Sequence, residues 1–108
     1  MVTISDFASM GLRVGRIIEV EDLEGSRKPM YKLKVDLGEL GTRNLVAGLK
    51  GYYSREELLN TDIIVVTNLE PKRIANFVSE GMLLAADDGT NVVLVRPEKE
   101  ISPGSTIR

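Results

Sequence analysis

Strict alternation of apolar and charged residues is the feature that most constrains this chain. Residues 31–37 read YKLKVDL, so every odd-numbered side chain is apolar or aromatic and every even-numbered one is charged. Successive side chains of a β-strand point to opposite faces, so this period of two predicts a strand with one face in a core. Lys32, Lys34 and Asp36 should then point toward solvent.

The segment LRVGRIIEVE, residues 12–21, follows the same period less regularly and predicts a second long strand. Arg16 interrupts the alternation, and the adjacent Gly15 predicts a bulge or a bend of the kind that closes a barrel. We expect the inner face to carry Leu12, Val14, Ile18 and Val20, and the outer face to carry Arg13, Gly15, Ile17 and Glu19.

The rest of the chain adds shorter strands and one helix. Ser54 and Glu57 have the spacing of a capping box, which predicts a short helix at SREELL that ends near Asn60. The turn Asp87-Asp88-Gly89 predicts a hairpin. We expect a short strand at 43–47 (RNLVA), buried strands at 62–66 (DIIVV) and 81–86 (GMLLAA), and a final strand at 92–95 (VVLV).

The predicted order is three strands, a helix and two buried strands, the second of which turns through a hairpin into residues 92–95, within a single domain over residues 1–108. That order, with a bend-marking glycine in the first strand, favours an all-β fold. The specific expectation is a five-stranded Greek-key barrel of the oligonucleotide-binding type (OB-fold) with short helices. Another small barrel or a β-sandwich stays open on the pattern alone.

Composition argues against catalysis. The chain contains no Cys and no His, which excludes thiol nucleophiles, imidazole acid–base chemistry, disulfides and the usual zinc sites. The acidic pairs Glu56/Glu57 and Asp87/Asp88 have structural explanations, because acids favour the first turn of a helix and hairpin turns. We therefore expect a non-catalytic binding protein with no metal and no cofactor.

The chain also lacks the signals of membrane or secreted proteins. No apolar run approaches the ~20 residues needed to span a bilayer. The first ten residues, MVTISDFASM, contain neither a basic start nor an apolar stretch typical of a signal peptide. We expect a cytoplasmic protein with no membrane partner.

A nucleic-acid partner would have to meet a local basic patch, because the formal net charge is −2. Lys32 and Lys34 point outward in the predicted barrel, and Arg13 lies on the outer face of the neighbouring strand. Arg27 and Lys28 fall in the loop between those strands, where such barrels often bind nucleic acid. The competing interpretation is an ordinary solvated strand face.

Aromatic residues are few, which bears on the kind of nucleic acid. Single-strand binders usually stack bases on several rings. This chain has three Tyr and two Phe, and Tyr31 points into the predicted core. If it binds nucleic acid, we expect it to hold the backbone of a folded RNA rather than splayed bases.

Residues 68–86, NLEPKRIANFVSEGMLLAA, combine a cationic pair with a polar turn. Pro71 cannot donate a backbone hydrogen bond and should end the preceding strand, so that Lys72 and Arg73 project from a stiffened loop. Ser79 and Gly81 then read as a turn hydroxyl and a bend. Met82 reads more readily as a core residue than as a functional one.

Several segments together carry a resemblance to a known family. LRVGRIIEVE, NLVAGLKGYYSREELLNTDIIVVTNLEPKRI, SEGMLLAADDG and PEKEISPGSTIR resemble the tRNA-binding domain family over nearly the whole chain. That family includes C-terminal domains of many methionyl-tRNA synthetases, free-standing tRNA-binding proteins and endothelial-monocyte-activating polypeptide. The resemblance implies an OB-fold barrel that dimerises and holds tRNA by its shape.

The resemblance also suggests which residues contact tRNA. It places Asn68, Lys72, Arg73, Ser79 and Met82 on the signature loop of the family, and Arg43 and Asn44 among the polar residues at the head of a strand. With the two strand-face lysines, the candidate tRNA-binding set is Lys32, Lys34, Arg43, Asn44, Asn68, Lys72, Arg73, Ser79 and Met82.

Three functions stay open at this stage. The favoured one is a tRNA-binding module, homodimeric, and either free-standing or an accessory beta subunit that partners a methionyl-tRNA synthetase catalytic chain. The second is a CsaA-like secretion chaperone for unfolded polypeptides, because LEGSRKPMYKL resembles those proteins more than the synthetase-linked members, many of which carry His-Pro-x-Ala-x-Lys-Leu there. The third is a structural dimerisation domain. Apolar residues near both ends predict the homodimer: Val2, Ile4, Phe7, Ile101 and Ile107.

Overall fold

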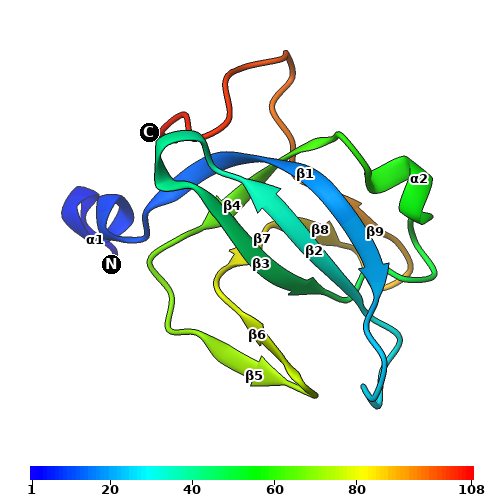
Figure 1. The fold of residues 1–108 in the computed structure, drawn as a ribbon. Coiled ribbons are helices and arrows are strands. Elements are labelled where there is room, and N and C mark those ends of the chain that lie inside the picture. The colour runs from blue at the N-terminus through cyan, green and yellow to red at the C-terminus, as the bar shows by residue number, and fades with distance from the viewer.

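The computed structural model describes residues 1–108 as a nearly closed antiparallel barrel of five strands with short helices, which confirms the predicted OB-type fold (Figure 1). The strand order is β3-β2-β1-β4-β7, and two further hairpins, β5-β6 and β8-β9, form small sheets of their own. The elements are α1 (Ile4–Ser9), β1 (Leu12–Asp22), β2 (Tyr31–Asp36), η1 (Gly38–Leu40), β3 (Thr42–Ala47), α2 (Arg55–Leu58), β4 (Asp62–Val66), β5 (Lys72–Ile74), β6 (Phe77–Ser79), β7 (Met82–Leu83), β8 (Ala85–Asp87) and β9 (Val92–Leu94).

Strand β1 is the central element and changes partners along its length. Its first half pairs with β4, from Leu12 to Arg16, and its second half pairs with β2, from Arg16 to Asp22. The C-terminal segment bonds to the first half as well: the Val14 N–H donates to the Ser105 carbonyl (2.9 Å). The chain end thus covers the part of β1 that β2 leaves free.

The faces of β1 differ from the sequence prediction at Gly15, Ile17 and Ile18, because Gly15, expected on the outer face, is buried. Ile17 was expected to point outward and is completely buried in the main core, whereas Ile18 is exposed. Ile17 is buried because the first half of β1 is covered on both faces, with Leu12 and Val14 in a smaller apolar cluster and Ile17 in the main core. A register shift between Ile17 and Glu19 leaves Ile18 as the extra residue of a bulge, which reverses the faces beyond it. A bulge was predicted, and it lies after Gly15 rather than at it.

Gly15 allows the barrel to close tightly around β1. A Cβ atom built on Gly15 would lie 2.5 Å from Val35 Cγ1 and 3.1 Å from a methyl of Val65, inside the core. The missing side chain therefore lets β2 and β4 both pack against β1. The alternation of β2 is confirmed in full, with its odd-numbered residues buried.

The two helices differ in how far the sequence predicted them. Helix α2 begins after Ser54, and its capping box with Glu57 is present as predicted. Helix α1 was not predicted. It has its own capping box between Thr3 and Asp6, and it buries no residue.

The segment 81–86 was predicted as one buried strand, and this prediction is wrong. The chain forms β7 against β4 and then turns into β8, which pairs with β9. Met82 is 50% exposed and so is not a core residue. The Asp87-Asp88-Gly89 turn of the β8-β9 hairpin is confirmed, and Asp88 Oδ1 accepts the backbone N–H groups of Thr90 and Asn91.

Lys72 and Arg73 lie on a strand, not in the loop that was predicted. They belong to β5, which pairs with β6 in a short hairpin, and Ala75 in its turn has a φ of 55°. Pro71 precedes the hairpin, and β4 ends at Val66.

The molecule has no helix with the length and apolar character needed to cross a membrane.

Candidate nucleic-acid interface

A cleft of about 490 Å³ lies between the β1–β2 loop and the β5-β6 hairpin, which project side by side at one end of the barrel (Figure 1). Arg27 and Lys28 line it from the loop, and Lys72 and Arg73 line it from the hairpin. No acidic residue lines the cleft, and none of the four cations forms a salt bridge. The cleft therefore concentrates four uncompensated positive charges on a molecule that is slightly acidic overall.

Both walls of this cleft are short hairpin structures. The loop is closed at its base by the Leu23 N–H, which donates to the Met30 carbonyl (3.0 Å). Gly25 supplies a left-handed turn with a φ of 81°. The opposite wall is held by the antiparallel pairing of Lys72 with Ser79 and of Arg73 with Val78. The four cations are thus carried on closed hairpins rather than on loose termini.

Beside the cleft, the outer face of β1 and β2 forms a smaller groove whose charges are balanced. Lys32 and Lys34 point outward as predicted, but Lys32 Nζ lies 3.2 Å from Glu21 Oε2 and Lys34 Nζ lies 3.5 Å from Glu19 Oε2. Lys32 Nζ also lies 5.5 Å from the centre of the Phe77 ring. The groove, about 100 Å³, is lined by Glu19, Glu21, Lys32, Lys34, Asn44 and Phe77.

Arg13 does not join this surface, contrary to the sequence prediction. Its guanidinium donates to the Gly104 carbonyl (2.9 Å), and Arg13 pairs with Thr106 of the C-terminal segment. The reason is the change of partners along β1, because β2 and its lysines accompany only the second half of that strand.

Two of the predicted contact residues hold the barrel closed. The Arg43 guanidinium donates to the carbonyls of Thr67 (2.6 Å) and Glu80 (3.4 Å), and the Asn44 N–H donates to Glu80 Oε1 (2.9 Å). These bonds join β3 to the end of β4 and to the turn after β6. The Asn44 side chain also lines the charge-balanced groove.

Ser79 and Asn68 have internal partners too. Ser79 is 6% exposed; its hydroxyl accepts the Val46 N–H (3.0 Å) and donates to the Gly81 carbonyl (3.1 Å). The Asn68 side-chain amide donates to the Ser9 carbonyl (2.6 Å) and so ties α1 to the end of β4. Met82 lies exposed on β7 and lines neither the cleft nor the groove.

The structure therefore brings together only part of the predicted set. Lys72 and Arg73 share the cleft, while Lys32, Lys34 and Asn44 share the groove beside it. Sequence reasoning missed Glu19 and Glu21. Their alternate spacing on the strand expected to neighbour Lys32 and Lys34 could have indicated cross-strand ion pairs.

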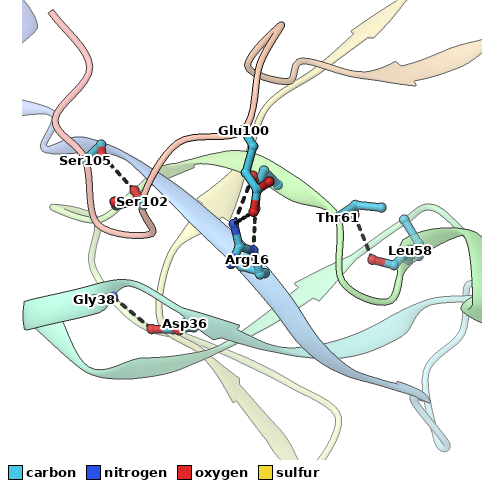
Figure 2. A network of polar contacts seen from close by, with 9 residues as sticks. Arg16, Asp36, Gly38, Leu58, Thr61, Glu100, Ser102 and Ser105 are labelled. Atoms are coloured by element: carbon cyan, nitrogen blue, oxygen red, sulfur yellow. Dashed lines mark hydrogen bonds and ion pairs between the residues drawn. The ribbon is translucent and has the colours of Figure 1, made fainter.

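A second polar cluster lies away from the cleft and fixes the C-terminal segment against β1. Figure 2 shows Glu100 of that segment reaching Arg16 on β1. Arg16 Nε donates to Asp62 Oδ1 (2.8 Å), and the hydrogen bond and charge of Asp62 raise the pKa of the Arg16 guanidinium. Arg16 is thus held by carboxylates from two segments, and its role is structural.

An apolar groove of about 330 Å³ lies at the end of the barrel where α1 and the C-terminal segment meet. Ile4 and Phe7 line it from α1, and Ile107 lines it from the chain end. Ile4 is 86% exposed and Phe7 is 37% exposed, although both are large and apolar.

A family model and several known proteins match this chain. The family model "Putative tRNA binding domain" matches residues 12–106. A protein named methionine–tRNA ligase from Pyrococcus horikoshii is 55% identical over 107 residues, which is 99% of this chain and 14% of that protein. The chain thus spans only a small part of the length of this relative.

Solved structures are similar over the whole chain. The CsaA chaperone protein from Picrophilus torridus is 42% identical, with a TM-score of 0.93 and complete coverage of both chains. A MetRS-related protein from Pyrococcus horikoshii is 28% identical, with a TM-score of 0.89 and coverage of 100% of this chain and 98% of the other. On the matched sequence and the shared barrel, this chain belongs to the tRNA-binding domain family.

Proposed function

We propose that this protein binds tRNA by its shape and phosphate backbone, largely independently of sequence, and performs no chemistry itself. The observation that carries the proposal is the cleft with four uncompensated cations, Arg27, Lys28, Lys72 and Arg73. Lys and Arg that neutralise phosphates release bound counterions, and this supplies affinity without reading bases. The family match supports tRNA as the nucleic acid.

Among the remaining predicted residues, we propose different roles. Lys32, Lys34 and the Asn44 side chain lie in the adjacent groove and can contact backbone that extends beyond the cleft. Arg43, Asn68 and Ser79 affect RNA binding indirectly, by stabilising the barrel, because their polar groups already form hydrogen bonds within the protein. Met82 is exposed and can contact a ligand directly.

A folded RNA fits this surface better than an unpaired strand. Phe77 is the one aromatic residue lining the groove, the cleft has none, and one face of the Phe77 ring is approached by Lys32 Nζ. Binders of unpaired strands instead combine a basic groove with several stacking rings.

The experiment is a filter-binding titration with unfractionated tRNA and with poly-U over a series of salt concentrations. We expect tighter binding of tRNA, and a linear fall of log affinity with log salt. Poly-U that binds as tightly as tRNA would contradict shape recognition, and no saturable binding of tRNA at low salt would refute the proposed function.

We propose that the working form is a homodimer whose two copies meet through the apolar groove at α1. The exposed Ile4 and Phe7 and the absence of any buried residue in α1 support this, because a second copy would cover side chains that one copy leaves in water. Light scattering at micromolar concentration should give twice the mass of 11.9 kDa. Phe7→Asp should return it to a monomer, and a monomeric mass for the unaltered protein would refute this arrangement.

We further propose that the protein works in the cytoplasm as a free-standing or accessory subunit that delivers tRNA to a methionyl-tRNA synthetase catalytic chain. The relative named methionine–tRNA ligase supports this partner, since 99% of the present chain aligns with part of it. Adding the protein to a catalytic chain that lacks this domain should lower the KM for tRNA and leave kcat little changed. An unchanged KM would contradict the partnership.

The structural likeness to CsaA supports a second candidate, a chaperone that binds unfolded polypeptide in the apolar groove. The two functions use different ends of the barrel, so a competition experiment separates them. Tight binding of a reduced, unfolded polypeptide that Phe7→Asp abolishes, together with no binding of tRNA, would favour the chaperone.

With either function, residues 1–108 should unfold as one domain in a single cooperative transition.

A further inference from the structure

The outer face of β1 and β2 carries two ion pairs in a regular cross-strand ladder. Glu19 lies opposite Lys34 and Glu21 lies opposite Lys32 in the register of the sheet, and each pair is in contact through its charged groups. The bulge after Ile17 places both glutamates on this face, beside the lysines. The groove therefore carries two cations and two anions, in contrast to the four uncompensated cations of the cleft.

The groove and the cleft are neighbours on one surface. Phe77 lines the groove, and its cross-strand partner Ile74 lines the cleft. Lys32 lies beside the hairpin, with its Nζ 5.5 Å from the centre of the Phe77 ring, and this lysine is already paired with Glu21. Phosphate and carboxylate compete for the same ammonium group, since both are anionic oxygen acceptors.

We propose that Glu19 and Glu21 are internal counter-ions of Lys34 and Lys32, which RNA phosphates must displace, and that these two carboxylates thereby limit RNA binding on the strand face. This inference rests on the proposed function. The exchange is feasible because the pairs are solvent-accessible, with the side chain of Glu19 58% exposed and that of Glu21 62% exposed, and accessible ion pairs are weak.

The pairing has a measurable signature in the salt dependence. A lysine and its glutamate together carry no net charge, so a phosphate that arrives there keeps most of its own counterion. A lysine freed from its glutamate neutralises the phosphate, and each phosphate neutralised adds ~0.7–0.9 to the slope of log affinity against log salt. Removing both carboxylates should therefore steepen the slope by about 1.4–1.8.

The test is filter binding of unfractionated tRNA over a salt series to the full chain and to Glu19→Gln/Glu21→Gln. The matched control is Glu39→Gln/Glu98→Gln, which changes the net charge equally at two exposed acids outside both the cleft and the groove and free of salt bridges. We expect the Glu19→Gln/Glu21→Gln variant to bind tRNA several-fold more tightly than the control at low salt, with the steeper slope of log affinity against log salt. Each single variant should give about half of the change, which keeps the test available if the double variant folds poorly.

A quadruple variant tests whether the lysines cause the gain in affinity. Adding Lys32→Ala and Lys34→Ala to the double glutamine variant should abolish the gain. The inference is overturned if the glutamine pair behaves like its control, or if the gain persists without the lysines. Failure of the proposed function looks different, because the unaltered protein would then bind no tRNA at any salt concentration, and the inference would fall with it.

Discussion

Replacing both hairpin cations, as Lys72→Ala/Arg73→Ala, is the most direct test of the cleft. Both side chains are exposed on β5 and make no hydrogen bond or salt bridge, so we expect the free energy of unfolding to change by less than about 0.5 kcal/mol. The cleft would keep Arg27 and Lys28 and lose half of its positive charge.

The size of the effect follows from counting phosphates. If each of the four cations neutralises one phosphate, the slope of log affinity against log salt is about −2.8 to −3.6, and affinity falls about 50–150-fold between roughly 50 and 200 mM salt. With two cations the slope is about −1.4 to −1.8, and affinity falls only about 7–12-fold over the same range.

The assay is a filter-binding or gel-shift titration with unfractionated tRNA at several salt concentrations, with folding checked by circular dichroism. Arg96→Ala/Lys99→Ala is the matched control, because it removes the same charge from two exposed cations outside the cleft. If the hairpin variant shows the same slope and affinity as the unaltered protein, the cleft does not bind phosphate, and the chaperone becomes the better candidate.

Three further predictions concern the framework. Ser79→Ala leaves the buried Gly81 carbonyl and the partly buried Val46 N–H without their hydroxyl partner, so urea unfolding should show a loss of ~1–3 kcal/mol, while the folded fraction binds tRNA with unchanged affinity. Gly15→Ala puts a methyl group against Val35 and should cost ~1–3 kcal/mol by overpacking, whereas a stable variant would show that β1 moves freely. The Thr3 N–H donates to the Asp6 carboxylate and lowers the pKa of that carboxyl below its usual 3.8. The carboxylate therefore stabilises α1 above pH 3.8 and ceases to do so as the pH falls through the lowered pKa. Protection factors of the α1 amides against hydrogen exchange should fall there, and Asp6→Asn should abolish this pH dependence.

Where the sequence predicted local structure well, the physical cause was itself local. The alternation in residues 31–37 specifies one buried face, and a shift by one residue would expose every apolar side chain of β2. The capping box of α2 needs only Ser54 and Glu57. Both features could be derived without knowing the neighbouring strands.

The errors arose where distant segments decide the outcome. Ile17 is buried because distant segments cover both faces of the first half of β1. Ile18 is exposed because it is the extra residue of a bulge, and the bulge is visible only once β2 is paired with β1. Segment 81–86 splits because β8 pairs with β9 rather than continuing along β4. The charge balance of Lys32 and Lys34 likewise depends on the register between two strands, which residue types alone do not specify.

The position of the two chain ends has a consequence for how this fold can be tethered. Strand β1 leads from α1, beside which the C-terminal residues lie, to the β1–β2 loop that forms a wall of the cleft (Figure 1). A polypeptide joined to either end would thus leave the barrel on the side away from the four cations. A catalytic domain attached there would leave the cleft open and would meet bound tRNA at the high effective concentration that a short linker provides.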